Sequence, residues 1–234
     1  MKPSVRALLL LSLVCLTVDT ALARQARPLT RRIVRSPQLS MQYHRAEAAW
    51  KSGSSVLEAK ARVDRVIKAL PQDQEARKLR AKVLLVLNRP KAALLDAREA
   101  VRLNPDDGEA YLILCEAARR GGEIELARKS LDQAAERIID ESQLHIRLSW
   151  NAVELKEYDR AEAYARIALA QGPEEAAAYY QMARVFFLKG QTDDAAIVLA
   201  RGLKAEVLDP KVIRTDNVLR HLVGHPALGK WLPR

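Results

Sequence analysis

Residues 176–209 read AAAYYQMARVFFLKGQTDDAAIVLARGLKAEVLD and carry the local signals of two successive helices. Tyr179, Met182 and Phe186 recur at helical spacing, which predicts a first amphipathic helix. Lys189-Gly190 is typical of a helix end, and Thr192 is a candidate N-cap for a second helix over residues 193–203. The stretch therefore predicts one helical hairpin.

A ladder of alanines repeats this hairpin through the chain. At intervals of 34 residues, Ala195 is preceded by Ala161, Ala127, Ala93 and Ala59. A fixed period of this length indicates one supersecondary unit that is repeated and stacked. No useful stretch alternates with period two, so we predict an all-α solenoid without strands.

Other positions of the repeat fit a known pattern. When units are counted from Ser40, position 4 is tyrosine in three units, and position 8 is Ala81, Cys115, Ser149 and Ala183 in the last four. This pattern resembles the tetratricopeptide repeat (TPR) family. The resemblance implies a right-handed α-solenoid of about five helical hairpins, over residues 40–73, 74–107, 108–141, 142–175 and 176–209.

The first unit departs from the pattern. Glu47 stands at its small position 8 and Ala46 at position 7, so we expect a shifted register or an atypical terminal repeat. In the second unit Arg77 takes the aromatic position, where its stem can lie on apolar surface while its guanidinium reaches water.

The segment after the fifth unit is expected to cap the array. Residues 210–223 predict a capping helix with Ile213, Leu219 and Leu222 on its inner side, since an open solenoid end exposes apolar surface. Residues 224–234 form a C-terminal tail, in which we expect Trp231 to fold back onto the cap. A docking motif is the alternative for this tail.

The N-terminal residues predict export. Residues 1–23 combine Lys2 and Arg6 with an apolar run over 7–18 and the small residues of Ala21-Leu22-Ala23, the layout of a secretory signal peptide. We expect a periplasmic or secreted protein. An uncleaved N-terminal membrane anchor is the alternative, although the apolar run is shorter than the roughly 20 residues that a spanning helix needs.

The net charge of +10 is concentrated near the N-terminus. Residues 24–39 hold five arginines, Arg24 to Arg35, and no acids, and residues 1–23 contribute +1, so only +4 remains for residues 40–234. This distribution does not indicate nucleic-acid binding. We predict a flexible basic leader over 24–39 that is either a solvated linker or a weak contact for an anionic membrane.

Catalytic and metal-binding patterns are nearly absent. No zinc-protease, phosphate-loop or nucleophile-elbow motif occurs, and the acid pairs, such as Asp106-Asp107, fall at expected helix starts where the dipole favours them. His221 and His225 have ligand spacing, but Gly224 and Pro226 interrupt the helix there. Cys115 is expected to be a buried small hydrophobe. We predict a non-enzymatic protein without a cofactor.

The TPR resemblance implies that function lies on a surface. In this family, the first helices of successive units line a concave groove, and positions 2, 5, 9 and 12 face the partner. Here these positions predict a groove that is basic at one end and aromatic at the other. The candidate partner-binding residues are Lys78, Lys82, Arg119, Trp150, Tyr180, Arg184 and Phe187.

Two qualifications apply to this groove. Lys78 and Lys82 resemble half of the carboxylate clamp of some TPR proteins, but no asparagine completes it. The aromatic residues are where binding energy would concentrate, unless the chain's own tail or a neighbouring molecule fills the groove.

The sequence thus predicts an exported scaffold or assembly factor of the cell envelope, which binds a peptide or helix of a partner protein. The alternative is a self-associating structural array, joined through the solenoid ends or the C-terminal tail.

Overall fold

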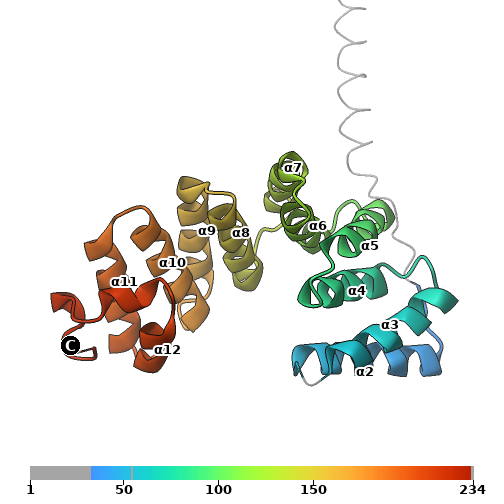
Figure 1. Ribbon diagram of the computed structural model, residues 1–234, viewed down its shortest axis with the longest axis horizontal. Helices are drawn as coiled ribbons and strands as arrows, with labels where there is room; N and C mark the ends of the chain where they lie inside the picture. The colour runs from blue at the N-terminus through green and yellow to red at the C-terminus, as the bar shows by residue number, and fades with distance from the viewer. Residues whose placement is uncertain (1–32, 54, 233–234) are drawn as a thin grey trace, which may run out of the picture. The chain divides into compact units, whose positions relative to one another are not determined.

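The computed structural model describes residues 33–53 and 55–232, and the regular structure in these ranges is helical throughout (Figure 1). The helices discussed below all lie within Arg35–Arg234. The predicted signal peptide over 1–23 and most of the predicted leader lie outside the described residues. Within those residues, no helix has the length and apolar character that crossing a bilayer requires.

Ten of the helices form five consecutive hairpins, which confirms the predicted α-solenoid. The hairpins are α2 (Pro37–Lys51) with α3 (Val56–Ala69), α4 (Gln74–Val86) with α5 (Pro90–Leu103), α6 (Gly108–Arg120) with α7 (Ile124–Ala135), α8 (Ser142–Glu154) with α9 (Tyr158–Gln171), and α10 (Ala176–Leu188) with α11 (Thr192–Lys204).

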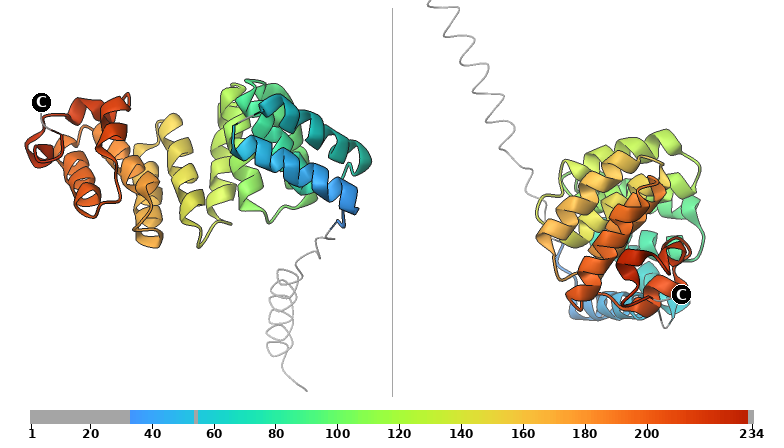
Figure 2. Two further views of the ribbon diagram at one scale, coloured as in Figure 1. Left: turned by 90° about the horizontal axis from the view of Figure 1, so that it is seen from below. Right: turned by 90° about the vertical axis from the view of Figure 1, so that its left-hand side faces the viewer.

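The hairpins stack so that the helices form two rows (Figure 2). The first helices, α2, α4, α6, α8 and α10, each contact the next first helix, and we call them the inner row. The second helices, α3, α5, α7, α9 and α11, make up what we call the outer row. Each of the first four packs between the first helix of its own unit and that of the following unit, whereas α11 packs against the C-terminal segment.

The alanine ladder marks the places where these helices pack most closely. All five ladder alanines, from Ala59 to Ala195, have no exposed surface, and neither do Ala81, Cys115, Ser149 and Ala183 at position 8. Small side chains let two helix backbones approach, so each unit buries its apolar side against its neighbours.

The turns within four hairpins share one backbone feature. Position 15 has a positive φ in units two to five, at Asn88, Gly122, Lys156 and Gly190. Glycine adopts this left-handed conformation without strain, whereas Lys156 pays a conformational cost for the same turn. The start of α11 differs by one residue from the prediction: Gln191 is its N-cap, and Thr192 is its first helical residue.

The first unit begins earlier than predicted. Helix α2 starts at Pro37, with the Ser36 hydroxyl accepting a hydrogen bond from the Leu39 N–H, and Arg35 forms an ion pair with Asp73. The last residues of the predicted flexible leader, 35–39, are therefore ordered parts of the fold. As expected for an atypical terminal repeat, Ala46 is fully buried while Glu47 is partly exposed and pairs with Lys51.

The C-terminal cap is not the single helix that the sequence predicts over 210–223. It consists of α12 (Pro210–Thr215), η1 (Leu219–Leu222) and η2 (Pro226–Leu228). The Asp216 carboxylate accepts hydrogen bonds from the N–H groups of Val218 and Leu219, both at 2.8 Å, which starts a new turn instead of continuing α12.

The cap and the tail both cover the last unit. Ile213, Leu219 and Leu222 are buried with residues of α10 and α11. Leu228 and Leu232 have no exposed surface, and the Gly224 N–H donates to the Leu232 carbonyl at 3.1 Å. The tail therefore folds back, as predicted, and seals the apolar end of the array.

Candidate functional site on the inner row

The predicted partner-binding residues all lie on the inner row. Lys78 and Lys82 come from α4, Arg119 from α6, Trp150 from α8, and the remaining three from α10. Each of these helices contacts the next one in the row. Most of them, however, already contact other groups of the chain.

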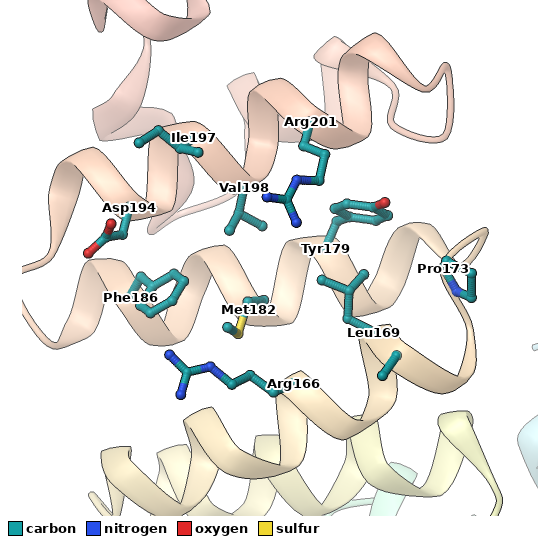
Figure 3. A pocket seen from close by; sticks show the side chains of 11 residues that line it. Arg166, Leu169, Pro173, Tyr179, Met182, Phe186, Asp194, Ile197, Val198 and Arg201 are labelled. Carbon is teal, nitrogen blue, oxygen red and sulfur yellow. The ribbon is translucent and has the colours of Figure 1, made fainter.

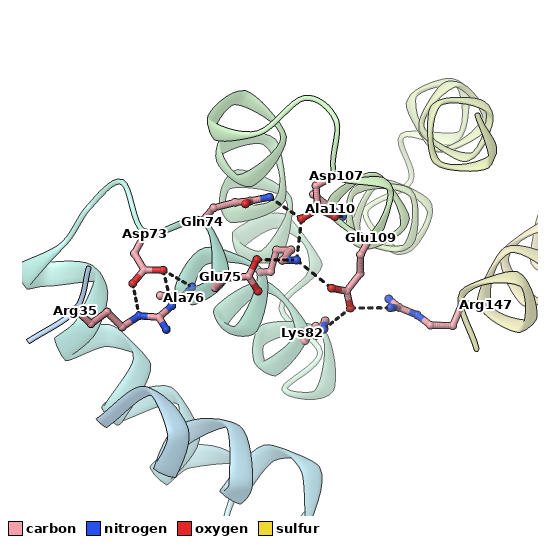
Figure 4. A network of polar contacts seen from close by, with 11 residues as sticks. Arg35, Asp73, Gln74, Glu75, Ala76, Lys82, Asp107, Glu109, Ala110 and Arg147 are labelled. Atoms are coloured by element: carbon pink, nitrogen blue, oxygen red, sulfur yellow. Dashed lines mark hydrogen bonds and ion pairs between the residues drawn. The ribbon is translucent and has the colours of Figure 1, made fainter. Parts of the chain in front are cut away.

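At the basic end, the lysines are neutralised by acids of the next inner helix. The Lys78 side chain lies in the interior, with the residue only 6% exposed, and its ammonium donates to Asp107 at 2.7 Å and to Glu109 at 3.0 Å. Lys82 donates to the other Glu109 oxygen at 2.6 Å, and Arg147 reaches the same oxygen at 3.2 Å (Figure 4).

The electrostatics of this cluster keep Lys78 and Glu109 charged. Burial raises the pKa of the Glu109 carboxyl, but Lys82 and Lys78 outweigh it and hold that pKa at about 2. Burial lowers the pKa of Lys78, but Glu109 and Asp107 outweigh it and raise that pKa above its usual value. The lysines are thus committed to internal acids and do not form an open basic clamp.

The middle of the inner row presents an exposed aromatic ring. Trp150 is 42% exposed, and the Arg184 guanidinium lies 4.5 Å from the centre of its ring. Beside it, Arg119 and Glu154 form an ion pair at 3.1 Å between α6 and α8. An accessible tryptophan stacked on an arginine is the feature of this face most suited to binding a partner.

At the aromatic end, the C-terminal cap contacts all three predicted residues of α10. The Tyr180 hydroxyl donates to the Asp209 carbonyl at 3.0 Å, Arg184 pairs with Asp216 at 3.1 Å, and the Phe187 ring stacks on His221 with centroids 6.0 Å apart. It is thus the cap segment, not the tail over 224–234, that meets this end of the groove, and Trp150 is left as the exposed aromatic.

A column of acids was not recognised in the sequence, although it keeps the same 34-residue interval. These acids occupy position 34 of each unit, at the N-cap of the helix that follows. They are Asp73, Asp107, Glu141, Glu175 and Asp209.

Side chains of the inner helices bind two acids of this column at the junctions between units. Gln74 and Lys78 both donate to Asp107, and Gln143 donates to Glu175 at 2.6 Å. Arg35, which precedes α2, donates hydrogen bonds to the Asp73 carboxylate. Asp73 also caps α4 by accepting a hydrogen bond from the Ala76 N–H (Figure 4). Several groove positions therefore join consecutive units.

Family models of the tetratricopeptide repeat match residues 43–101, 79–142 and 152–214. This chain belongs to the TPR family. Among curated proteins, the 58 kDa phosphoprotein of Plasmodium berghei is 41% identical over 63 residues, which are 27% of this TPR chain and only 15% of that relative's length.

Several solved structures are similar to this TPR protein. TTC0263 of Thermus thermophilus is 24% identical over 78% of this chain and 95% of its own, with a TM-score of 0.62. PilW, a type IV pilus biogenesis factor, is 20% identical over 85% and 96%, with a TM-score of 0.63. MamA from Desulfovibrio magneticus RS-1 is 14% identical over 74% and 97%, with a TM-score of 0.57. At these identities the likeness concerns the fold.

The cysteine and the two histidines that could take part in chemistry are all packed against, or close to, other residues of this TPR fold. Burial raises the pKa of the Cys115 thiol to about 12, so the reactive thiolate is not formed near neutral pH. His221 stacks on Phe187, and His225 Nε2 lies 3.0 Å from Asp193. Within residues 33–53 and 55–232, no three acidic, histidine or cysteine side chains gather as a metal site would need.

Proposed function

We propose that this TPR protein is a non-enzymatic scaffold of the cell envelope that holds a peptide or helix of a partner protein against its inner row. The observation that carries the proposal is Trp150, a half-exposed ring backed by Arg184 on a face that is otherwise occupied by internal ion pairs. Tryptophan and arginine supply much of the binding energy at protein interfaces.

The internal contacts narrow the set of residues that we propose to bind the partner. Lys78 and Lys82 would have to give up Asp107 and Glu109 to engage a carboxylate, so they act mainly in joining the units. Trp150, Arg184 and the adjoining Arg119 then form the centre of the proposed site, bounded at one end by the cap. Phe187 and Tyr180 contribute to its edge through their contacts with the cap.

The proposed location rests on the N-terminal residues and on the likeness to PilW. Residues 1–23 have the layout of an export signal, and PilW is described as a type IV pilus biogenesis factor. A contact with an anionic membrane would use the arginines between 24 and 32, since Arg35 is held by Asp73. Its strength would fall with added salt.

Affinity capture with crosslinking from an envelope extract tests the proposal. The wild-type chain is compared with Trp150→Ala and with the double variant Trp150→Ala, Phe187→Ala. We expect partner capture to fall with the first substitution and to be lost with the second, with a cost of roughly 2 kcal/mol for each hot spot.

The matched control is Leu95→Ala on the outer row. Leu95 is 67% exposed, so its truncation removes an exposed apolar side chain from another surface. Capture should then equal that of the wild type, and circular dichroism should show the same helical content in every variant. Equal capture by Trp150→Ala and the wild type would show that the partner does not use the inner row.

A further inference from the structure

A groove of about 530 Å³ lies on the outer row, between α9 and α11 (Figure 3). Its floor consists of Tyr179, Met182 and Phe186 of α10, and Leu169 and Val198 line its sides. Two arginines, Arg166 and Arg201, and one acid, Asp194, stand around this apolar floor. None of these residues belongs to the proposed inner-row site.

The equivalent groove three units earlier is lined by different residues. It lies between α3 and α5, has a volume of about 420 Å³, and is lined by Arg77, Arg80, Asp64 and Asp96. Arg80 binds Asp96 at 2.6 Å and Asp64 at 3.1 Å, and Arg77 binds Asp96 at 2.9 Å. The charged side chains Arg77, Arg80, Asp64 and Asp96 of that groove are thus paired with one another.

The same positions in the fifth unit carry apolar residues. At an offset of 102 residues, Arg80 corresponds to Met182 and Asp96 to Val198, so the central ion pair is replaced by a thioether and an isopropyl group. The floor of the groove between α9 and α11 can therefore receive an apolar group from outside.

The charges around this groove are incompletely matched. Arg166 pairs with Glu162, but that carboxylate also binds Lys189. Arg201 forms no hydrogen bond or ion pair with any residue that the structure describes. In Figure 3 its guanidinium lies beside Val198 and Tyr179, while Asp194 stands at the opposite end, near Phe186.

We propose that this groove is a second binding site, which takes an acidic segment of a partner protein. One large apolar side chain of the segment would pack on Met182 and Phe186, and a neighbouring carboxylate would pair with Arg201. Asp194 would repel a carboxylate at its own end, which fixes the direction of the segment. The chain's own leader does not match, because residues 24–35 are rich in arginine and contain no acid.

Methionine methyl NMR on the full chain tests this site. The chain has three methionines: Met182 lies in the groove, whereas Met41 on α2 serves as an internal control. The probes are three capped hexapeptides, EELFEE, KKLFKK and EEGSEE, which separate the acidic from the apolar requirement. We expect EELFEE to shift the Met182 resonance and leave that of Met41 unchanged, and the other two to bind at least about tenfold more weakly.

Two charge-reversal variants complete the test. Arg201→Glu should weaken EELFEE binding about tenfold, whereas Lys204→Glu, an equal charge change on the same helix but outside the groove, should change it less than about twofold. The proposal is overturned if EELFEE leaves Met182 unshifted, if KKLFKK binds as tightly, or if the two variants behave alike. A Met182 shift that depends only on protein concentration would overturn it too, and would assign the groove to a second copy of the chain.

Discussion

At the residue scale, Glu109 has the most consequential surroundings in the inner row. Its two oxygens receive Lys78, Lys82 and Arg147, so one carboxylate joins α4, α6 and α8. The strength of a buried cluster depends on every member remaining charged, because an unpaired buried charge is costly. The stability of the array should therefore respond to the titration of this one group.

We expect the stability of the protein to fall in acid through Glu109. The carboxyl has an ordinary pKa of 4.5, which the fold lowers to about 2. A lowered pKa stabilises the fold fully above the unfolded-state value, and this contribution is lost as the pH falls from about 4.5 towards 2. It amounts to at most about 3 kcal/mol. Thermal denaturation between pH 2 and 7 measures it.

Glu109→Gln should flatten that acid dependence and lower stability at neutral pH, since it leaves the buried Lys78 without one of its carboxylate partners. Glu125→Gln is the control, because Glu125 is exposed on α7 and its substitution removes the same charge. If both variants kept the wild-type acid profile, Glu109 would not be the group that titrates.

The alanine ladder gives a second expectation at this scale. Ala127 has no exposed surface, so Ala127→Leu should lower the free energy of unfolding by roughly 1 to 3 kcal/mol through overpacking. Ala163→Leu, at an exposed position on another outer helix, should have little effect in the same urea titration. Equal stability of the two variants would contradict close packing at Ala127.

At the element scale, hairpins were easier to predict from the sequence than the cap. The period of 34 residues fixed the place of each helix because buried small residues repeat with it. In the cap, the apolar residues Ile213, Leu219 and Leu222 suggested one continuous helix, but the Asp216 side chain accepts two backbone N–H groups and starts a new turn. This local competition with helix hydrogen bonds is not visible in apolar spacing.

Asp216→Ala should loosen the cap without unfolding the array. It removes the two backbone hydrogen bonds and the ion pair with Arg184, which should cost about 1 to 2 kcal/mol. Hydrogen exchange at Val218 and Leu219 should become faster, while exchange in α6 should stay unchanged. Asp216→Asn retains an acceptor oxygen and should have a smaller effect; equal acceleration by both would show that the charge, not the capping, holds this turn.

At the scale of the whole molecule, neighbouring units share one interior. One cluster of buried residues runs from Ala81 on α4 to Val185 on α10, a second joins the first unit to α4, and a third joins α9 to the last unit and its cap, so each unit is stabilised by its neighbour. The sequence predicted this stacking and placed the candidate residues on one face. It did not reveal which of them bind the chain itself, because Lys78 meets Glu109 only when consecutive units are packed, and Arg184 meets Asp216 only when the cap folds onto the fifth unit.

The tail covers the C-terminal end of the array, which disfavours self-association through that end. Leu228 and Leu232 are buried and the Trp231 ring is partly covered, so the tail is not free to join another copy. We expect the chain without residues 1–23 to be monomeric in light scattering at micromolar concentration. A concentration-dependent rise in mass would instead favour the self-associating array.

The acid column lies where consecutive units join. Each one ends in an acid at the N-cap of the following helix, and Gln74, Lys78 and Gln143 donate hydrogen bonds to the acid that ends their own unit. A complete 34-residue unit could be duplicated or removed with these partners still matched, whereas an insertion of any other length would separate them. The length of the array can thus change by whole units during evolution or engineering, while the cap covers the apolar surface of the last unit.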